Sequence, residues 1–384
     1  MKVLINNSQV KPGITKSLCE FNYSLISDDS SLRIINKAVK EKLSLNPESL
    51  IIIGVGGSSN GVKAVLNTKN NTMIKALLAE SLDSDKLFLI KKYLRNELRA
   101  GRKTLINVIS KSGRTTEILA ITQVLINVLK RHVRNWKDYI IITSDSGSEL
   151  FSLANDKGIT ALSIDENPAG RYSLFTSAGL FPLGILGFNI KDLIKGARKA
   201  SIESANKTAF IKHYHYKKGR RINVFFPFSE NFYGFREWIN QLISESLGKD
   251  GKGITPVTSI GTIDLHSMLQ LFLEGPDDKF TTFIKIKNNY DDVKVSKGSF
   301  FNHNKSFNEL LNITYAGVKK SYINNKRPFI ELIINDKSEE CIGELLHYLM
   351  HETILLGRLL KVNTFNQPSV EFYKDYVRRK LKFT

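Results

Sequence analysis

The chain has 384 residues, a formal net charge of +19 and 42% hydrophobic residues. At roughly 150 residues per domain, this length predicts two or three domains with buried cores and excludes a peptide hormone or a coiled-coil rod. The composition is that of a folded globular protein. The positive charge suits nucleic acid, an anionic membrane surface or an anionic small substrate equally well, so charge alone does not identify a partner.

Two features indicate a cellular location. The two cysteines, Cys19 and Cys341, are too few and too far apart for a disulfide framework or a metal knuckle, which predicts a reducing compartment. The first residues, MKVLINNSQVKPG, break their apolar run with polar residues, so we expect no export signal and a cytoplasmic protein. The uncharged stretch from Tyr172 to Ile190 approaches the length of a membrane span, but Pro182 and several small polar residues favour a buried helix.

Strand-like and helix-like segments alternate along the chain. Near Ser49, an apolar β-branched run ends at glycines and passes into helix-compatible residues: ESLIIIGVGGSSNGVKAVLN. The pattern returns in TLINVISKSGRTTEILAITQVLINVL, in DYIIITSDSGSELFSLANDKG and in RINVFFPFSENFYGFREWINQLISESLGK. Such alternation implies crossover connections, so we predict an α/β fold with parallel sheets covered by helices on both faces.

A change of character between Pro182 and Arg220 suggests a domain boundary. The basic, helix-compatible stretch KDLIKGARKASIESANK precedes renewed strands at Arg221. We therefore expect an N-terminal domain over 1–200 and a C-terminal domain over 201–384. The second domain contains the strand-like segments FTTFIKIK and RPFIELIIND, the helix GELLHYLMHETILLGRLL and a basic helical tail.

Two loops that follow apolar strands are candidate ligand sites. The first, SKSGRTTE from Ser110 to Glu117, opens a helix and has hydroxyls and a glycine that can converge on one anion. The alternative is an ordinary turn capped by Ser or Thr. The second, GVGGSSNG, fails as a dinucleotide fingerprint because Ser59 stands where the third glycine is required. Gly56 and Gly57 still allow a ligand to approach the backbone closely.

Three polar residues could supply acid–base or electrostatic chemistry. Glu245 lies four positions after Gln241 on one predicted helix face, in the last turn before Gly248, where a carboxylate should be a stronger base. His266 is expected at a helix start, where a neutral imidazole is favoured. Arg171, at the edge of the uncharged stretch, could bind an oxyanion. The alternatives are an exposed helix face, a capping histidine and a structural ion pair, respectively.

Other motifs carry weaker signals. His347 and His351 have the helical spacing of zinc ligands, but the glutamate of HExxH is missing, so we expect surface or packing roles and no metal site. The basic stretches KKYLRNELRAGRK and KRHVRNWK lack the aromatic signature of RNA-binding motifs and predict solvated helix faces. We expect no nucleic-acid partner.

Taken together, the segments resemble the glucose-6-phosphate isomerase family. The motifs GVGGSSNG, SKSGRTTE, AGRYS, QLISESLGKDGKG, DLHSMLQLFLEGP and FNQPSVEFYK occur in the family's order over residues 50 to 375. The resemblance implies two flavodoxin-like sugar-isomerase domains, a homodimer with shared active sites, and no metal or other cofactor. It implies interconversion of glucose 6-phosphate and fructose 6-phosphate through a cis-enediol.

The resemblance also assigns residues. It makes Glu245 the base, His266 of the neighbouring subunit and Lys374 the ring-opening groups, and Arg171 the stabiliser of the enediolate. The residues that it places against the phosphate or the sugar are Gly57, Ser58, Ser110, Lys111, Ser112, Thr115, Gly170, Gln241 and Gln367.

The chain departs from the family pattern at Arg114, Ala169 and Leu265, where a threonine, a glycine and a glutamine are usual. None of these is a proposed proton-transfer group, so the expected reaction type stands. The alternative function is a catalytically silent sugar-phosphate sensor that binds a macromolecule through its basic surface. The joint presence of Glu245, His266 and Lys374 favours the enzyme.

Overall fold

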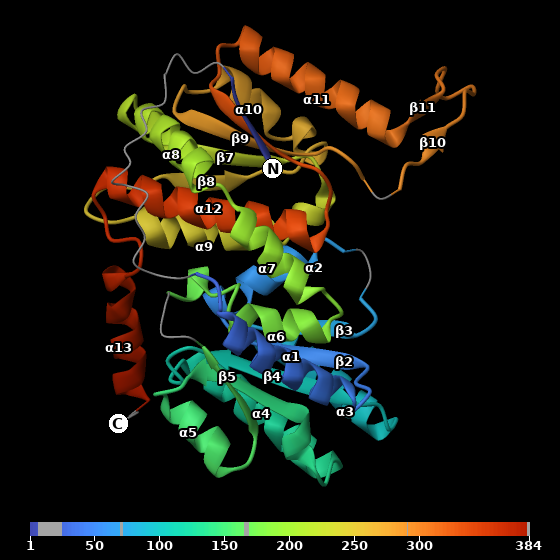
Figure 1. The fold of residues 1–384 in the computed structure, drawn as a ribbon, viewed down its shortest axis with the longest axis vertical. Coiled ribbons are helices and arrows are strands. Elements are labelled where there is room, and N and C mark those ends of the chain that lie inside the picture. The colour runs from blue at the N-terminus through green and yellow to red at the C-terminus, as the bar shows by residue number, and fades with distance from the viewer. Residues whose placement is uncertain (7–24, 70–71, 165–168, 290, 382–384) are drawn as a thin grey trace. The chain divides into compact units, whose positions relative to one another are not determined.

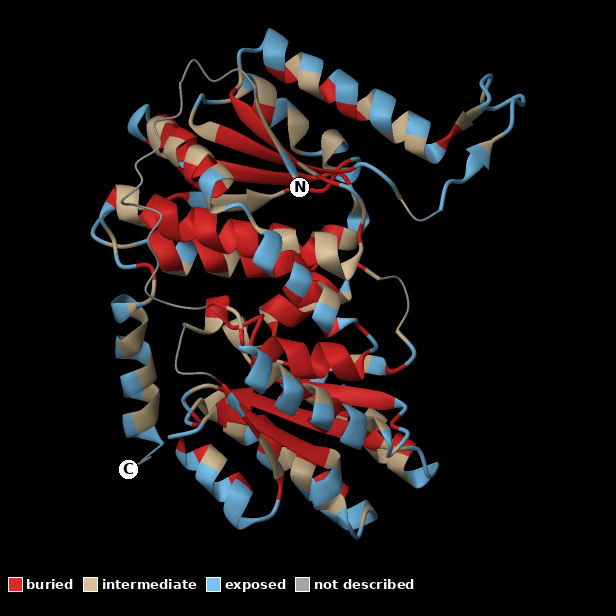
Figure 2. Cartoon of the chain, in the orientation of Figure 1, coloured by how far each residue is buried: buried red, intermediate tan, exposed pale blue. Residues whose placement is uncertain are grey.

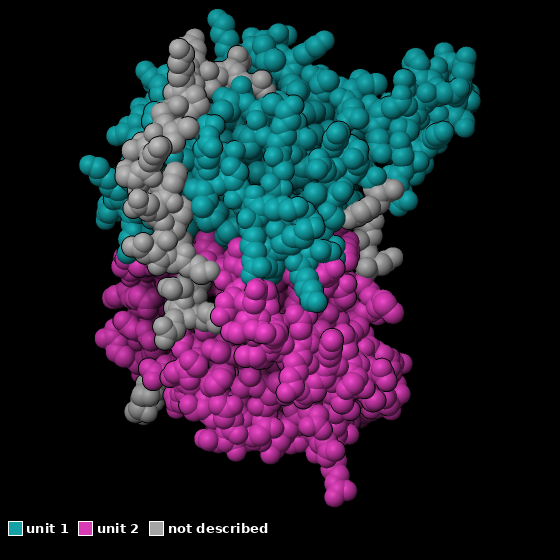
Figure 3. Space-filling view, in the orientation of Figure 1, with its two compact units in different colours: residues 1–20, 191–364 teal, residues 21–190, 365–384 magenta. Residues whose placement is uncertain are grey.

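The computed structural model describes residues 1–6, 25–69, 72–164, 169–289 and 291–381. The chain divides into two compact units, one of residues 1–20 and 191–364, here called unit 1, and one of residues 21–190 and 365–384, here called unit 2 (Figure 3). The chain thus passes from unit 2 to unit 1 after residue 190, close to the expected boundary near 200. The first residues group with unit 1, which the second half of the chain forms, and the last residues group with unit 2, which the first half forms. The division into domains over 1–200 and 201–384 stays a prediction.

Unit 2 is built on a five-stranded sheet with the order β3-β2-β4-β5-β6 (Figure 1). All of its strand pairs are parallel. Renumbered along the unit, this order is 2-1-3-4-5, the order of flavodoxin. The strands are β2 (Ser49–Ile53), β3 (Lys75–Ala79), β4 (Thr104–Ser110), β5 (Ile140–Asp145) and β6 (Thr160–Ile164).

Burial explains which of these strands could be predicted. Every residue of β2 and of β4 is buried, so both strands show as continuous apolar runs (Figure 2). The edge strands β3 and β6 were not predicted. Each is only partly buried: Ser163 interrupts the apolar residues of β6, and the short run Ala76–Ala79 of β3 lacks the β-branched residues that favour strands.

Helices cover both faces of the sheet in unit 2. Helices α3, α4 and α5 pack their apolar residues on one face, and α1 and α6 contact each other on the opposite side (Figure 1). The helices are α1 (Asp29–Leu43), α2 (Asn60–Leu66), α3 (Ser84–Arg99), α4 (Thr116–His132), α5 (Glu149–Asp156), α6 (Ser177–Ile185) and α13 (Glu371–Lys380). The prediction of an α/β fold with parallel strands covered on both faces is confirmed.

Unit 1 contains a second five-stranded sheet, with the order β1-β12-β9-β7-β8. Four strands are parallel and repeat the 2-1-3-4 order of unit 2. The fifth, β1, pairs antiparallel with β12 and takes the edge position, with Ile5 opposite Ile330. The strands are β1 (Lys2–Asn6), β7 (Ile222–Pro227), β8 (Thr255–Thr258), β9 (Lys279–Ile286) and β12 (Phe329–Ile334), and a separate hairpin joins β10 (Lys294–Val295) to β11 (Lys305–Ser306).

The two faces of this sheet are also covered. Phe226, Phe283 and Phe329 meet α10 and α11 on one face, and α12 packs against α8 and α9 on the other (Figure 1). The helices of unit 1 are α7 (Ile190–Lys199), α8 (Ile202–Lys217), α9 (Phe235–Leu247), α10 (Leu269–Glu274), α11 (Phe307–Asn324) and α12 (Glu339–Leu360).

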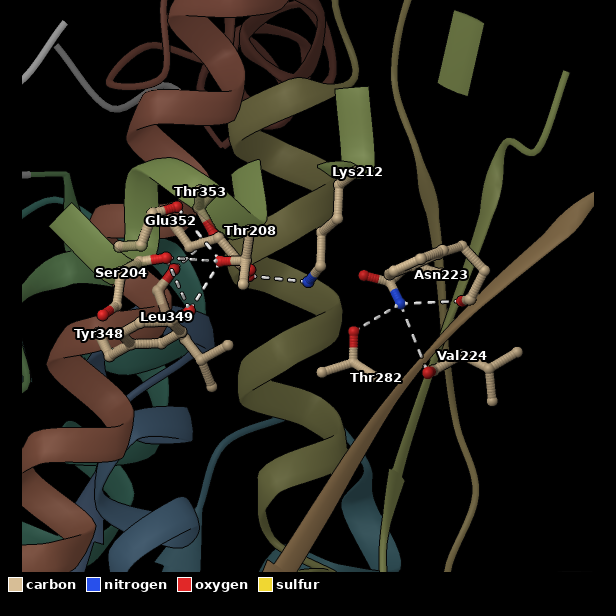
Figure 4. A network of polar contacts seen from close by, with 12 residues as sticks. Ser204, Thr208, Lys212, Asn223, Val224, Thr282, Tyr348, Leu349, Glu352 and Thr353 are labelled. Atoms are coloured by element: carbon tan, nitrogen blue, oxygen red, sulfur yellow. Dashed lines mark hydrogen bonds and ion pairs between the residues drawn. The ribbon is translucent and has the colours of Figure 1, made fainter. Parts of the chain in front are cut away.

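A polar network joins α8 to α12 inside this apolar layer (Figure 4). Lys212 Nζ donates to Glu352 Oε2 at 2.7 Å, and the two side chains are 2% and 1% exposed. Beside them, the hydroxyls of Thr208 and Tyr348 lie 2.7 Å apart. Burial lowers the pKa of Lys212, and attraction to Glu352 opposes that shift.

The uncharged stretch forms a buried helix, as predicted. Every residue of α6 is buried, including Pro182. Within the described residues, no helix is both long enough and apolar enough to cross a bilayer. Cys341 is a free thiol, and Cys19 lies outside the described residues.

Candidate active site

Both candidate loops lie at the point in unit 2 where the strand order reverses. Strands β2 and β4 are neighbours, with Ile53 beside Val108. From β2 the chain crosses to β3 on one side, and from β4 it crosses to β5 on the other. In open parallel sheets, this divergence leaves a crevice at the carboxyl ends of the two strands, where ligands bind. The loops after β2 and β4 hold Gly57, Ser58 and the segment 110–115.

The loop after β4 differs from a simply capped turn. Thr115 is the N-cap residue of α4, but its side chain makes no capping hydrogen bond. Instead, Ser110 Oγ donates to Thr115 Oγ1 at 3.4 Å. Gly113 has a φ of +66°, and a Cβ at this position would lie 2.9 Å from Leu150 Cβ. The loop therefore keeps hydroxyls and amides at the N-terminus of a long helix, where the dipole favours an anion.

Two glycine turns meet in unit 2. Gly57 lies in the short 3-10 helix η2 (Gly56–Ser58) and Gly170 in η4 (Gly170–Tyr172). A Cβ on Gly57 would lie 2.2 Å from the carbonyl carbon of Gly170 and 2.6 Å from Arg171 N. The sequence predicted a close approach to a ligand at this glycine, and the structure shows a close approach to the backbone that carries Arg171.

Arg171 contacts another residue that the sequence singled out. Its guanidinium is buried and donates to Gln367 Oε1 at 3.0 Å and to the Asn366 carbonyl at 3.2 Å. The neighbouring rings of Tyr172 and Phe365 are 5.4 Å apart. Since Arg171 and Gln367 are 196 positions apart in the sequence, only the fold brings them together.

Lys374 lies apart from this cluster in the described contacts. It is on α13, where Nζ donates to Glu371 Oε1 at 2.8 Å. The side chain is 38% exposed. No described contact joins it to Arg171 or to the 110–115 loop.

Unit 1 carries the predicted base. Glu245 lies in the last turn of α9, which ends before Gly248 as expected. Gln241 Nε2 donates to Glu245 Oε1 at 3.3 Å, so the two side chains share a face. Lys249 Nζ donates to the carbonyls of Glu245 and Ser246. This ammonium offsets the negative end of the helix, a contact that was not predicted from the sequence.

His266 departs from its expected position. It is exposed and ends the 3-10 helix η6 (Ile263–His266), and α10 begins only at Leu269. The expected position of His266 at the start of this helix is therefore wrong. The apolar residues of this segment serve in packing, since Leu265 and Met268 contact the aromatic core of unit 1.

The candidate residues thus form two groups, one in each unit. Unit 2 holds those of the two glycine turns, the 110–115 loop, Arg171, Gln367 and Lys374, and unit 1 holds Gln241, Glu245 and His266. Three supporting residues were missed: Asn366 and Lys249, described above, and Ser144 on β5, whose hydroxyl donates to the Ser110 carbonyl. Asn366 adjoins Gln367 in the sequence, whereas the contacts of Ser144 depend on strand pairing and have no local signal.

The departures Arg114 and Ala169 lie within or next to the candidate loops: Arg114 belongs to the 110–115 loop and Ala169 precedes Gly170. Arg114 Nε lies 4.0 Å from Glu149 Oε2, and both side chains are exposed. Ala169 precedes η4 as its N-cap and makes no side-chain capping bond.

The two histidines of HYLMH pack inside unit 1. Their rings are 4.2 Å apart, and His347 Nδ1 lies 2.6 Å from the Ala197 carbonyl. Burial lowers the pKa of His347 to about 4 and that of His351 to about 3. The described residues contain no group of three or more His, Cys, Asp or Glu that could hold a metal ion. A packing role is confirmed and a surface role is wrong.

The chain is similar to several known proteins. A glucose-6-phosphate isomerase of Campylobacter jejuni is 32% identical, over 96% of this chain and 92% of that protein. A probable glucose-6-phosphate isomerase of Methanococcus maripaludis is also 32% identical, over 86% of this chain and 78% of that protein. No protein-family model matches the chain.

Solved structures share the fold. A hypothetical protein of Thermus thermophilus has a TM-score of 0.82 and 27% identity, covering 92% of this chain and 88% of that one. A glucose-6-phosphate isomerase of Chlamydia trachomatis has a TM-score of 0.80 at 20% identity, covering 92% of this chain and 73% of that one. With sequence similarity over nearly the whole chain and a matching fold, the protein belongs to the glucose-6-phosphate isomerase family.

Proposed function

We propose that this protein is a sugar-phosphate isomerase that interconverts glucose 6-phosphate and fructose 6-phosphate. The observation that carries the proposal is the contact between Arg171 and Gln367 beside the junction of Gly57 with Gly170. It gathers, in one unit, residues from distant motifs that the family resemblance assigns to one substrate. The names of the relatives support the enzyme over a silent sensor.

The phosphate would bind at the loop after β4. Ser110, Ser112 and Thr115 would supply hydroxyls and Lys111 a backbone amide, at the N-terminus of α4. The sugar would lie against Gly57, Ser58, Gly170, Gln241 and Gln367.

The reaction is a proton transfer between adjacent carbons. Glu245 would remove the proton from C2 of the open-chain aldose, and the C–H electron pair would form the C1–C2 double bond as the carbonyl oxygen becomes an enediolate. The Arg171 guanidinium would stabilise that negative charge. Glu245 would then return the proton to C1, as a hydroxyl proton moves between O1 and O2, to give the ketose. His266 and Lys374 would assist ring opening.

The proposal includes the assembly. We propose that each unit is a sugar-isomerase domain and that the chain forms a homodimer in which His266 acts in the neighbouring subunit. A carboxylate base and a cationic stabiliser suffice for this chemistry, so no metal or other cofactor takes part. The proposed location is the cytoplasm.

The test is conversion of fructose 6-phosphate, followed with a coupled dehydrogenase, by the parent protein and by Glu245→Gln. Loss of a positioned base should lower kcat by about 10²- to 10⁴-fold. Glu237→Gln makes the same change at an exposed position on the same helix and should leave kcat unchanged.

Each outcome has a distinct meaning. Parent-like turnover by Glu245→Gln would refute the assignment of the base. Absence of turnover in the parent protein, with sugar phosphate still bound in calorimetry, would instead identify a binding protein.

A further inference from the structure

Ser144 supports the loop after β4 from the neighbouring strand. It is fully buried near the carboxyl end of β5, beside Ser110 in the strand pairing. Its Oγ donates to the Ser110 carbonyl at 2.6 Å and lies 3.4 Å from the Lys111 carbonyl. Because a serine hydroxyl has one hydrogen, the Ser148 hydroxyl, 2.6 Å away, must donate to Ser144 Oγ. Ser148 in turn accepts from the Phe151 N–H and caps α5.

A second contact fixes the next peptide group. The Asp145 N–H donates to the Lys111 carbonyl at 3.1 Å. Strand β5 thus holds two consecutive carbonyls of the loop, those of Ser110 and Lys111.

The positions of these two carbonyls determine the directions of the N–H groups that follow them. In a planar trans peptide, the C=O and the following N–H point in opposite directions. With the carbonyls of Ser110 and Lys111 turned toward β5, the N–H groups of Lys111 and Ser112 face away from it. Within the described part of the chain, the Ser112 N–H donates to no other residue. The loop therefore presents amides, and not carbonyls, to an anion in the crevice.

We propose that Ser144 is a positioning residue for phosphate binding, acting through the Ser110 carbonyl. The inference rests on the proposed function, in which this loop binds the substrate phosphate. The Ser110 carbonyl also accepts from the Gly113 N–H at 3.2 Å, a bond within the loop's own turn. Without the Ser144 hydroxyl, this buried carbonyl loses the shorter of its two described hydrogen bonds, and the one that ties it to β5, so the peptide group between Ser110 and Lys111 can rotate toward solvent. An oxygen would then compete for the space that an anion requires.

The same sheet offers a matched control. At its opposite end, Ser49 Oγ and Thr104 Oγ1 lie 2.8 Å apart, and both residues are fully buried. Ser49→Ala removes a buried serine hydroxyl from the same sheet without touching the 110–115 loop. This control variant distinguishes a general loss of stability from a loss of positioning at the Ser110 carbonyl.

The experiment compares Ser144→Ala with Ser49→Ala. In Ser144→Ala, we expect KM for fructose 6-phosphate and Ki for inorganic phosphate to rise together by about fivefold, the effect of losing one of two hydrogen bonds to a buried carbonyl. The value of kcat should change little, because phosphate binding is lost equally in the ground and transition states. In Ser49→Ala, KM and Ki should equal those of the parent protein.

A second pair of variants controls for side-chain volume. Ser144→Thr keeps a hydroxyl, and Ser144→Val introduces a side chain of the same shape as threonine but without the hydroxyl. Ser144→Thr should bind phosphate more tightly than Ser144→Val by about the same fivefold factor, whatever strain the extra methyl group adds.

Failure of the inference and failure of the proposed function are distinguishable. If the parent protein does not isomerise fructose 6-phosphate, the function fails, and the dissociation constant of inorganic phosphate from calorimetry still tests Ser144. Equal phosphate affinity in the parent protein and Ser144→Ala, an equal loss in Ser49→Ala, or no phosphate binding by the parent protein would each overturn the inference.

Discussion

Gly57 and Gly170 differ in how strictly the structure requires a glycine. At Gly57, a Cβ would overlap backbone atoms of the facing turn, the nearest at 2.2 Å. At Gly170, the nearest atom to an added Cβ is Gly57 Cα at 3.6 Å, an ordinary contact. The glycine at 57 is therefore required by packing, and the glycine at 170 is not required by the contacts of unit 2.

This asymmetry predicts unequal effects of the two alanine variants. Gly57→Ala must displace the turn that carries Arg171, and we expect kcat/KM for fructose 6-phosphate to fall roughly 100-fold, the typical cost of a misplacement of about 1 Å. Gly170→Ala should cause a clearly smaller fall. Steady-state kinetics of both variants, with circular dichroism to verify folding, would test this. Equal losses would show that the clash at Gly57 does not control activity.

At this scale, the sequence predicts the positions of residues that depend on a short stretch of chain. The hydroxyl-rich 110–115 loop and the position of Glu245 follow from neighbouring residues, because a strand end and a helix end are set within one or two turns of chain. His266 shows the limit. A 3-10 turn and a short helix have similar local patterns, so the residue at which α10 begins depends on how Phe272 packs in the core.

Helices α8 and α12 are joined by a buried ion pair inside an apolar layer. Lys212 Nζ also lies 4.7 Å from the centre of the Phe225 ring. Glu352 Oε1 has no hydrogen-bond partner in the described part of the chain. Such a pair adds little net stability, because desolvation of two charges offsets their attraction. Removing one partner leaves an uncompensated charge in the core.

We predict that Lys212→Met destabilises unit 1 by about 3–5 kcal/mol and that the double variant Lys212→Met, Glu352→Leu recovers most of this loss. Lys207→Met, which breaks the exposed pair with Glu203 on the same helix, should cost less than about 1 kcal/mol.

Trp238 is buried in unit 1, and the second tryptophan, Trp136, lies in unit 2. Urea unfolding followed by fluorescence in a Trp136→Phe background therefore reports unit 1. A double variant no more stable than Lys212→Met would contradict the prediction.

The buried histidines make the stability of the whole molecule depend on pH. His215, His347 and His351 are all buried in unit 1, and burial lowers the pKa of His215 to about 4. A histidine with a folded-state pKa below its unfolded value near 6.5 binds more protons when unfolded. The contribution of the buried neutral ring to the free energy of unfolding is complete above about pH 6.5. It is lost as the pH falls toward 4, by up to about 1.4 kcal/mol per pH unit.

Replacing one of these groups should reduce that dependence. For His351→Gln, we expect the loss in unfolding free energy of unit 1 between about pH 7.5 and about pH 5.5 to be about 1 kcal/mol smaller than in the parent protein. His303→Gln, at an exposed position, should leave the loss unchanged. Urea titrations at both pH values in the Trp136→Phe background measure the difference. An unaltered loss in His351→Gln would mean that the ring takes up protons over the same pH range in the folded and unfolded states, which would contradict the prediction.

The sequence by itself determined the fold class, the buried helix of the uncharged stretch and the order of the candidate loops. Apolar runs and glycine positions encode strands, helices and turns within short windows. The motifs also identified most candidate residues, because strand-to-loop and helix-end positions are local properties.

Only the tertiary structure decided which distant segments meet. Strand β1 completes a sheet with β12, more than three hundred residues away, and the segment after Thr364 brings Gln367 to Arg171. Ser144 reaches the loop after β4 because β5 pairs with that strand. These contacts arise from the sum of packing and hydrogen bonds over whole units, and no short stretch of sequence contains that sum.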